Sequence, residues 1–317
     1  MRSAFFNALL EAAGDNPRIN LITADLGFGV VEPFAKRFPG RFLNVGVAEQ
    51  NMTGIAAGLA MSGKTVFTYS IANFPTLRCL EQIRNDVCYH RADVKVVTVG
   101  GGFSYGALGM THHATEDLAI MRALPEMTVV APGDPIETVH ATRAIAITPG
   151  PAYLRLGRAG EAAVHTGPIE FQLGRAIKLR DGADVTLVST GAMLQTCAKV
   201  ADLLEERGIS ARLLSMHTLK PLDEAAITCA AGETGAIVTV EEHSVLGGLG
   251  GAVAEVLAES GISPLRFKRI GLPSEFAKYV GSQEYLRARY GLSEPAIVQQ
   301  VLALLDAKPA AVRRRYA

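Results

Sequence analysis

The sequence lacks an excess of charge of either sign. Its 317 residues contain 31 Lys and Arg against 31 Asp and Glu, so the formal net charge is zero. A surface that binds nucleic acid or an anionic membrane needs clustered basic residues. The basic cluster Arg313–Arg315 stands near the end of the chain, where we expect only a solvated tail. We therefore expect no nucleic-acid or membrane partner, and favour small molecules or another protein.

Cysteine is scarce, and long apolar runs are missing. Four cysteines (Cys79, Cys88, Cys197 and Cys229) form no CxxC pair and no metal-ligand spacing, so we interpret them as small buried apolar residues. No run of eighteen apolar residues occurs, and the N-terminal segment carries acids and no small-residue cleavage site. These absences predict neither a membrane span nor secretion, and we expect a cytoplasmic protein.

Several catalytic motifs are missing too. The sequence contains no P-loop, no GxSxG and no HExxH. The stretch "THHATED" (111–117) lacks a spaced third ligand, so we predict no metal site on this chain. The stretch "LGGLGGAVAEV" (246–256) opens a helix as a dinucleotide fingerprint would, but Val253 replaces the third glycine. We favour close helix packing there, and a nucleotide-dependent oxidoreductase is a remote alternative.

What the sequence does contain is two cycles of an α/β pattern. Short runs that are apolar on both faces alternate with segments of helical spacing, which is typical of mainly parallel sheets covered by helices. The fold class we predict is α/β with two domains, at 1–160 and 176–317, joined by a Gly- and Ala-rich linker at 161–175. The expected strands are 19–25, 65–71, 94–100, 127–132 and 152–157, then 184–190, 210–218, 236–242 and 264–272. In the second domain the expected helices lie near 192–207, 223–231, 248–259 and 293–306.

One acid, Glu49, stands out in "LNVGVAEQNMTGIAAGLAMSGK" (43–64), between an apolar run and a helix of small residues. An acid in the first turn stabilises a helix through its macrodipole, and this alone is a sufficient reason for it. The small apolar neighbours, however, would leave the carboxylate poorly solvated, which suits proton exchange. A catalytic role and a helix-stabilising role both stay open on spacing alone.

The same stretch resembles the pyrimidine-binding domain of the transketolase family, whose enzymes use thiamine diphosphate. The resemblance implies that Glu49 hydrogen-bonds N1′ of the aminopyrimidine. It continues along nearly the whole chain, because "ITADLGFGVV" places Asp25 near the cofactor. "TYSIANF" places Phe74 and Ile71 against the pyrimidine, with Ile71 where the family has an aromatic residue. An ordinary core role for Phe74 is equally open.

The resemblance also implies a substrate site. "LGMTHHATED" places His112 where a substrate hydroxyl or carbonyl is held, and "RLGR" places Arg158 on the residue that grips a phosphate. Arg78 and Arg2 are further possible substrate contacts, although a solvated surface role is at least as reasonable for both. His112 and Glu49 are the predicted catalytic residues.

Three positions depart from the family pattern. Leu108 replaces an Asp that reads the donor's hydroxyl, Gly100 replaces a second substrate His, and Gly29 replaces a phosphate-binding Ser. The usual transketolase substrates are therefore in doubt. Sulfo-sugars, deoxy-sugars, apiose-type sugars or a modified acceptor are open possibilities.

The family's diphosphate-binding motif, GDG followed by an Asn, does not occur in this sequence. The resemblance then implies a split enzyme, in which an N-terminal subunit binds the diphosphate and Mg²⁺ and the two chains share thiamine diphosphate, plausible as an α₂β₂ assembly. We predict the C-terminal subunit of a split transketolase (EC 2.2.1), active only with its partner. It would transfer a two-carbon ketol unit from a ketose or ketose phosphate to an aldose. The alternatives are a β subunit like those of 2-oxo acid dehydrogenases or 1-deoxyxylulose-5-phosphate synthase, or a non-catalytic partner.

Overall fold

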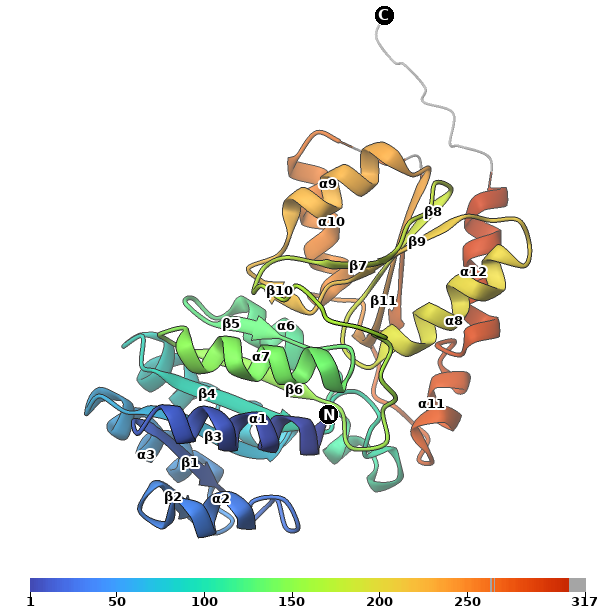
Figure 1. Cartoon of the computed structure of the whole chain (residues 1–317). Helices are drawn as coiled ribbons and strands as arrows, with labels where there is room; N and C mark the ends of the chain where they lie inside the picture. Colours follow the sequence, from blue (N-terminus) through green and yellow to red (C-terminus); the bar gives the residue numbers. More distant parts are fainter. Residues whose placement is uncertain (263, 265, 308–317) are drawn as a thin grey trace, which may run out of the picture.

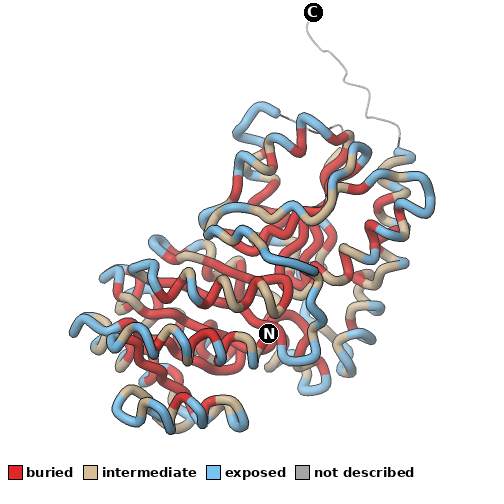
Figure 2. The backbone as a smooth tube through the Cα atoms, viewed as in Figure 1, coloured by how far each residue is buried: buried red, intermediate tan, exposed pale blue. Residues whose placement is uncertain are grey.

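The computed structural model describes residues 1–262, 264 and 266–307, so the Arg313–Arg315 cluster lies outside the described part. The chain folds into two sheets, each covered by helices on both faces (Figure 1). The most deeply buried backbone runs through the strands (Figure 2). Within the described residues, no helix is both long enough and apolar enough to cross a bilayer.

The first sheet has the strand order β10-β5-β6-β4-β3-β1-β2. Every pairing in it is parallel except that of β10 with β5. Helices α1 and α7 pack on one face through one apolar cluster, and α3, η2 and α6 pack on the other through a second. Its strands are β1 (Ile19–Thr23), β2 (Phe42–Asn44), β3 (Thr65–Ile71), β4 (Val94–Val99), β5 (Thr128–Val130), β6 (Ala152–Leu156) and β10 (Thr218–Lys220). Its helices are α1 (Arg2–Asp15), α2 (Glu32–Arg37), η1 (Pro39–Arg41), α3 (Glu49–Met61), α4 (Asn73–Thr76), α5 (Leu80–Gln82), η2 (Ile83–Cys88), η3 (Gly106–Leu108), η4 (Met110–His112), α6 (Asp117–Ala123) and α7 (Pro135–Ile147).

The second sheet has the order β12-β11-β8-β9-β7 and is parallel except for the edge strand β7. Helices α8 and α12 share one apolar cluster on one face of this sheet, while α9 and α10 cover the other face. Its strands are β7 (Ile177–Arg180), β8 (Val185–Ser189), β9 (Ala211–Ser215), β11 (Ala236–Ser244) and β12 (Arg266–Leu272). Its helices are α8 (Met193–Glu205), α9 (Glu224–Glu233), α10 (Leu249–Glu259), α11 (Gln283–Arg289) and α12 (Glu294–Asp306). The predicted fold class, two mainly parallel α/β sheets covered by helices, is confirmed.

Two details of the sequence prediction are wrong. The expected strand at 210–218 is two strands, because β9 ends at Ser215 and β10 then crosses over to pair with β5 of the first sheet. The crossing is held where Ala131 N donates to His217 O (2.8 Å). Cys229 is exposed on α9, whereas the other three cysteines are buried as expected.

A buried arginine, Arg155 on β6, joins the two sheets. Its guanidinium donates to both carboxylate oxygens of Asp117 (2.8 and 3.2 Å), to Ala114 O (2.7 Å) and to Glu242 O on β11 (3.1 Å). The Glu242 carboxylate in turn accepts from Phe103 N (3.2 Å). Since a buried charge is tolerated only when it is paired and hydrogen-bonded, this network fixes the loop 100–116 against the second sheet.

The segment between the sheets is anchored by one buried carboxylate, Asp134. Its Oδ1 accepts from Glu137 N (2.8 Å) and so caps α7. Its Oδ2 accepts from Val164 N (2.9 Å) and His165 N (3.1 Å) in the predicted linker. One side chain therefore satisfies both a helix start and a connection that has no regular structure of its own.

We expect Asp134→Ala to lower the free energy of unfolding by about 3 kcal/mol, because a helix cap and two hydrogen bonds to a buried charge are lost together. Urea unfolding followed by circular dichroism measures this. Asp181→Ala, which removes an exposed ion pair with Lys178, is the control and should cost at most about 0.5 kcal/mol. Equal losses for the two variants would contradict the anchoring role of Asp134.

Candidate functional site

Five adjacent strands of the first sheet end at one edge, where the predicted site residues gather. The strands β2, β1, β3, β4 and β6 are neighbours and run parallel, so the loops after them lie side by side. In open α/β sheets, ligands bind at this carboxyl edge. The loops carry, in the same order, Glu49, Asp25, Phe74 with Arg78, His112, and Arg158.

Glu49 begins α3 and is only 1% exposed. Its Oε2 accepts a 2.6 Å ion-paired hydrogen bond from Arg78 Nη1. In the described part of the chain, no hydrogen bond reaches Oε1. A buried carboxylate with one oxygen free for a proton-bearing ring nitrogen fits the aminopyrimidine of thiamine.

Arg78 has a partner that the sequence did not suggest. Its side chain is 48% exposed, it pairs with Glu49, and its guanidinium carbon lies 4.9 Å from the centre of the Phe74 ring. Its backbone carbonyl accepts from Gln50 Nε2 (3.1 Å), which ties it to the start of α3. In this structure Arg78 is thus the counter-ion of the buried acid, and its predicted role as a substrate contact stays a prediction.

Asp25 follows β1 and is held by a residue that the sequence analysis missed, Asn44. Asp25 has a positive φ of 53°, which is uncommon for a residue other than glycine. Asn44 Oδ1 accepts from Asp25 N (2.9 Å) and from Gly46 N (3.1 Å), while its Nδ2 donates to Asp25 Oδ1 (3.1 Å). A polar residue that ends a strand shortly before Glu49 was the available signal.

Rings form a row between the buried acid and Arg158. Phe74 meets His112 edge-on at 5.1 Å between centroids, Tyr105 lies 6.4 Å from His112, and the Arg158 guanidinium carbon lies 5.0 Å from the centre of the Tyr105 ring. Phe74 is half-buried, so it presents a ring to the site and does not lie wholly in the core. Tyr105 was missed from the sequence, although it is the one large polar side chain in "VGGGFSYGALG".

Ile71 and Arg2 lie at the margins of this row. Ile71 ends β3 and is 8% exposed within the apolar cluster under α1, so its predicted contact with a pyrimidine stays a prediction. Arg2 begins α1 and is half-buried, and its Nε is buried with no hydrogen-bond partner among the described residues. A fully solvated Arg2 is therefore wrong.

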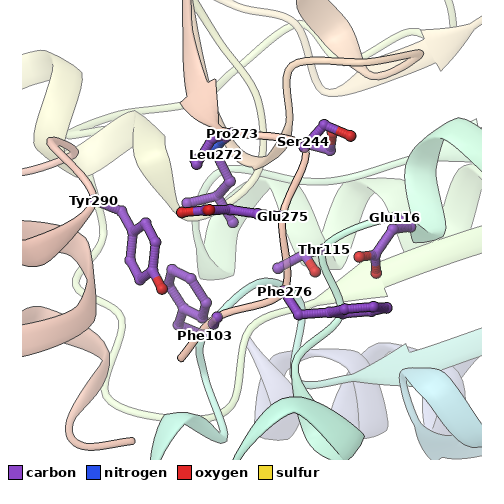
Figure 3. Close-up of a pocket in the computed structure, with 11 residues that line it drawn as sticks. Phe103, Thr115, Glu116, Ser244, Leu272, Pro273, Glu275, Phe276 and Tyr290 are labelled. Atoms are coloured by element: carbon purple, nitrogen blue, oxygen red, sulfur yellow. The ribbon is translucent and has the colours of Figure 1, made fainter. Parts of the chain in front are cut away.

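The second sheet closes one side of the site. A cavity of about 310 Å³ is lined by Phe74, Arg78 and Met110 from the first sheet and by Phe276 and Ala277 from the segment after β12. A neighbouring cavity of about 240 Å³ lies between the same segment and the loop after β4, and Figure 3 shows Phe276 beside Thr115 and Glu116 there. The site is thus built from both sheets.

Metal ligands do not cluster in the described ranges, because no group of three or more His, Cys, Asp or Glu side chains there could hold an ion. Of the three departures from the family pattern, Leu108 is 56% exposed, and Gly29 and Gly100 have positive φ angles of 83° and 99°. No carboxylate, hydroxyl or imidazole is present at these positions to contact a substrate.

This arrangement defines an α/β protein whose carboxyl edge offers a buried acid and a ring to a flat heterocycle, and an imidazole and a guanidinium to a substrate. Comparison with known families agrees. Residues 1–160 match the transketolase pyrimidine-binding domain, and residues 174–297 match the transketolase C-terminal domain. The chain belongs to the transketolase family, and it contains the pyrimidine-binding and C-terminal parts of that family.

Several relatives have the same length. One of the two kinds of chain in the apulose-4-phosphate transketolase of Phocaeicola vulgatus is 41% identical over 303 residues, which cover 95% of this chain and 96% of the relative. A chain of the 6-deoxy-6-sulfo-D-fructose transketolase of Clostridium sp., SqwH, is 40% identical over 309 residues, or 97% and 95% of the two chains. A solved structure, described as a split gene transketolase in an inactive β4 tetramer, is 41% identical with a TM-score of 0.87, covering 96% of this chain and 97% of its own. 1-Deoxy-D-xylulose-5-phosphate synthases also match, but this chain spans only about half of their length.

These findings bear out the predicted identity as the C-terminal subunit of a split transketolase. They also identify relatives in the apulose and sulfo-sugar branches that the departures at Leu108, Gly100 and Gly29 had left open.

We expect His112 to be mostly neutral at pH 7. Burial, and secondly the nearby His113, lower the pKa of His112 below its ordinary value. Its Nδ1 lies 3.0 Å from Thr111 Oγ1, which leaves Nε2 for a substrate. NMR titration of the imidazole nitrogens, assigned with a His112→Gln variant, should give a midpoint below the ordinary value of about 6.5. A midpoint above that value would contradict the burial of this ring.

Proposed function

We propose that this chain is the catalytic C-terminal subunit of a split transketolase and acts on thiamine diphosphate shared with an N-terminal subunit. The reaction is transfer of a two-carbon ketol unit from a ketose to an aldose. The observation that carries the proposal is the buried Glu49, with one free carboxylate oxygen, at the start of a row of rings that leads to Arg158.

In this proposal each residue has a defined task. Glu49 holds a proton at N1′ of the pyrimidine, and Phe74 with Ile71 packs against that ring. Thiamine diphosphate, when bound, supplies the carbanion chemistry of the reaction. His112 accepts a hydrogen bond from a substrate hydroxyl in its neutral form, and Arg158 binds an anionic group at the far end of the substrate.

Arg78 controls the charge of the acid. Its ion pair with Glu49 favours the carboxylate, whereas a hydrogen bond between Glu49 and a pyrimidine nitrogen needs a shared proton. The pair has one half-exposed partner, so Arg78 can move toward solvent at modest cost when the pyrimidine enters. Asp25, held by Asn44, lies in the loop beside this position.

The diphosphate and Mg²⁺ are assigned in this proposal to the partner subunit, in an α₂β₂ assembly in the cytoplasm. Two observations support a partner: the GDG motif does not occur in this sequence, and relatives of equal length carry the name of a subunit. The inactive state named for the related β4 tetramer agrees with a chain that needs a different partner.

The purified chain alone should be inactive, and addition of the N-terminal subunit with Mg²⁺ and thiamine diphosphate should restore ketol transfer, because the acid and the diphosphate site lie on different chains. A donor and acceptor screen, with ketose phosphates, sulfo-ketoses and pyruvate as donors, measures this by product mass. Turnover with pyruvate alone would favour a synthase-like or 2-oxo acid subunit instead. Full activity of the isolated chain would refute the split site.

In the reconstituted complex, Glu49→Gln should reduce kcat by about 100-fold or more, since loss of a positioned acid typically costs about 10² to 10⁴. The variant keeps the size of the side chain. Glu81→Gln, an acid nearby on α5 that makes no ion pair in the described part of the chain, is the control and should keep wild-type turnover. If Glu49→Gln also kept wild-type turnover, the chain would be a non-catalytic partner.

A further inference from the structure

We propose that Tyr105 contacts the substrate and, together with Arg158, selects substrates that end in a tetrahedral oxyanion such as a phosphate or a sulfonate. This inference rests on the proposed function and deepens it. It assigns a residue that sequence reasoning did not identify, in the loop between β4 and η3.

Tyr105 occupies the space that the lack of a side chain at Gly100 leaves open. A Cβ at Gly100 would lie 2.3 Å from Cδ2 and 2.4 Å from Cε2 of the Tyr105 ring. Gly100 also has φ of +99°, which a residue with a side chain adopts only under strain. The position where the resemblance placed an imidazole is therefore filled by a phenol from five residues further along the chain.

The hydroxyl of Tyr105 faces positive charge. The guanidinium of Arg158 lies over the ring, and the pKa of Tyr105 is raised by burial against the opposing charges of Arg158 and Arg2. The phenol is therefore a neutral hydrogen-bond donor at pH 7. In the described part of the chain its hydroxyl makes no hydrogen bond, and the buried Arg2 Nε is also without a partner. Together with the Arg158 guanidinium, these donors point to an anion with several oxygens.

There is room for such a group. A cavity of about 450 Å³ opens beside Tyr105, and its walls include Leu108 and Arg158 from the first sheet and Gln283 from α11. Leu108 brings no charge to it, so an anion there meets no like charge from that position. The same row of rings places His112 between this cavity and Phe74. A substrate that reaches from the cofactor end to the cavity would present its far terminus to Tyr105 and Arg158.

The experiment uses the reconstituted complex with Tyr105→Phe, which keeps the ring over Gly100 and removes only the hydroxyl. With the donor fixed, we expect the KM for D-ribose 5-phosphate to rise about tenfold and kcat to change less than about twofold. A tenfold change equals about 1.4 kcal/mol, the size of one hydrogen bond to a charged group. The KM for unphosphorylated D-ribose should not change. Tyr89→Phe, at an exposed tyrosine that directly follows η2, is the control.

Calorimetric titration of D-ribose 5-phosphate separates this inference from the proposed function. If the wild-type complex transfers ketol units and Tyr105→Phe leaves both the KM and the Kd unchanged, the inference is wrong and the proposed function stands. If no donor and acceptor react, the proposed function fails, and a tenfold weaker Kd in Tyr105→Phe would still support the contact. Equal KM changes for the phosphorylated and neutral sugars would show a general packing role and overturn the inference.

Discussion

The buried guanidinium of Arg155 is the constraint on which the site depends. Removal of a charge from water is expensive, and the cost is offset only when every donor finds a partner in good geometry. Arg155 meets this condition with Asp117, Ala114 O and Glu242 O, which belong to α6, to the loop after β4 and to the second sheet. The loop that carries Tyr105 and His112 can therefore take few positions relative to the second sheet, and Glu242 limits them further by its bond to Phe103 N.

The charges of the site are arranged by distance along the sheet edge. Glu49 and its counter-ion Arg78 lie at one end and Arg158 at the other, with the rings of Phe74, His112 and Tyr105 between them. These rings separate the acid from the distal guanidinium. A substrate placed along the row would meet a proton donor or acceptor near the cofactor and positive charge only at its far end, so the two tasks do not compete for one side chain.

How much could be predicted from the sequence depends on whether the signal is local. The alternation of apolar runs with helical spacing predicts parallel α/β sheets, and the neighbours of Glu49 predict its burial, because both signals lie within a short stretch of chain. The crossing of β10 to the first sheet could not be predicted, since it depends on pairing with β5, which is far away in the sequence. Arg78 as the partner of Glu49, Asn44 as the support of Asp25, and Tyr105 over Gly100 each depend on contacts across loops. Only the folded chain brings those loops together.

The short strand β10 also makes the two modules inseparable. It belongs by sequence to the second module, yet it pairs with β5 and so covers that edge of the first sheet. A fragment cut in the linker would leave β5 as an open edge with unpaired amide and carbonyl groups, which is a template for aggregation. Any rearrangement of the gene that exchanges the second module must therefore also supply a strand for the sheet of its neighbour.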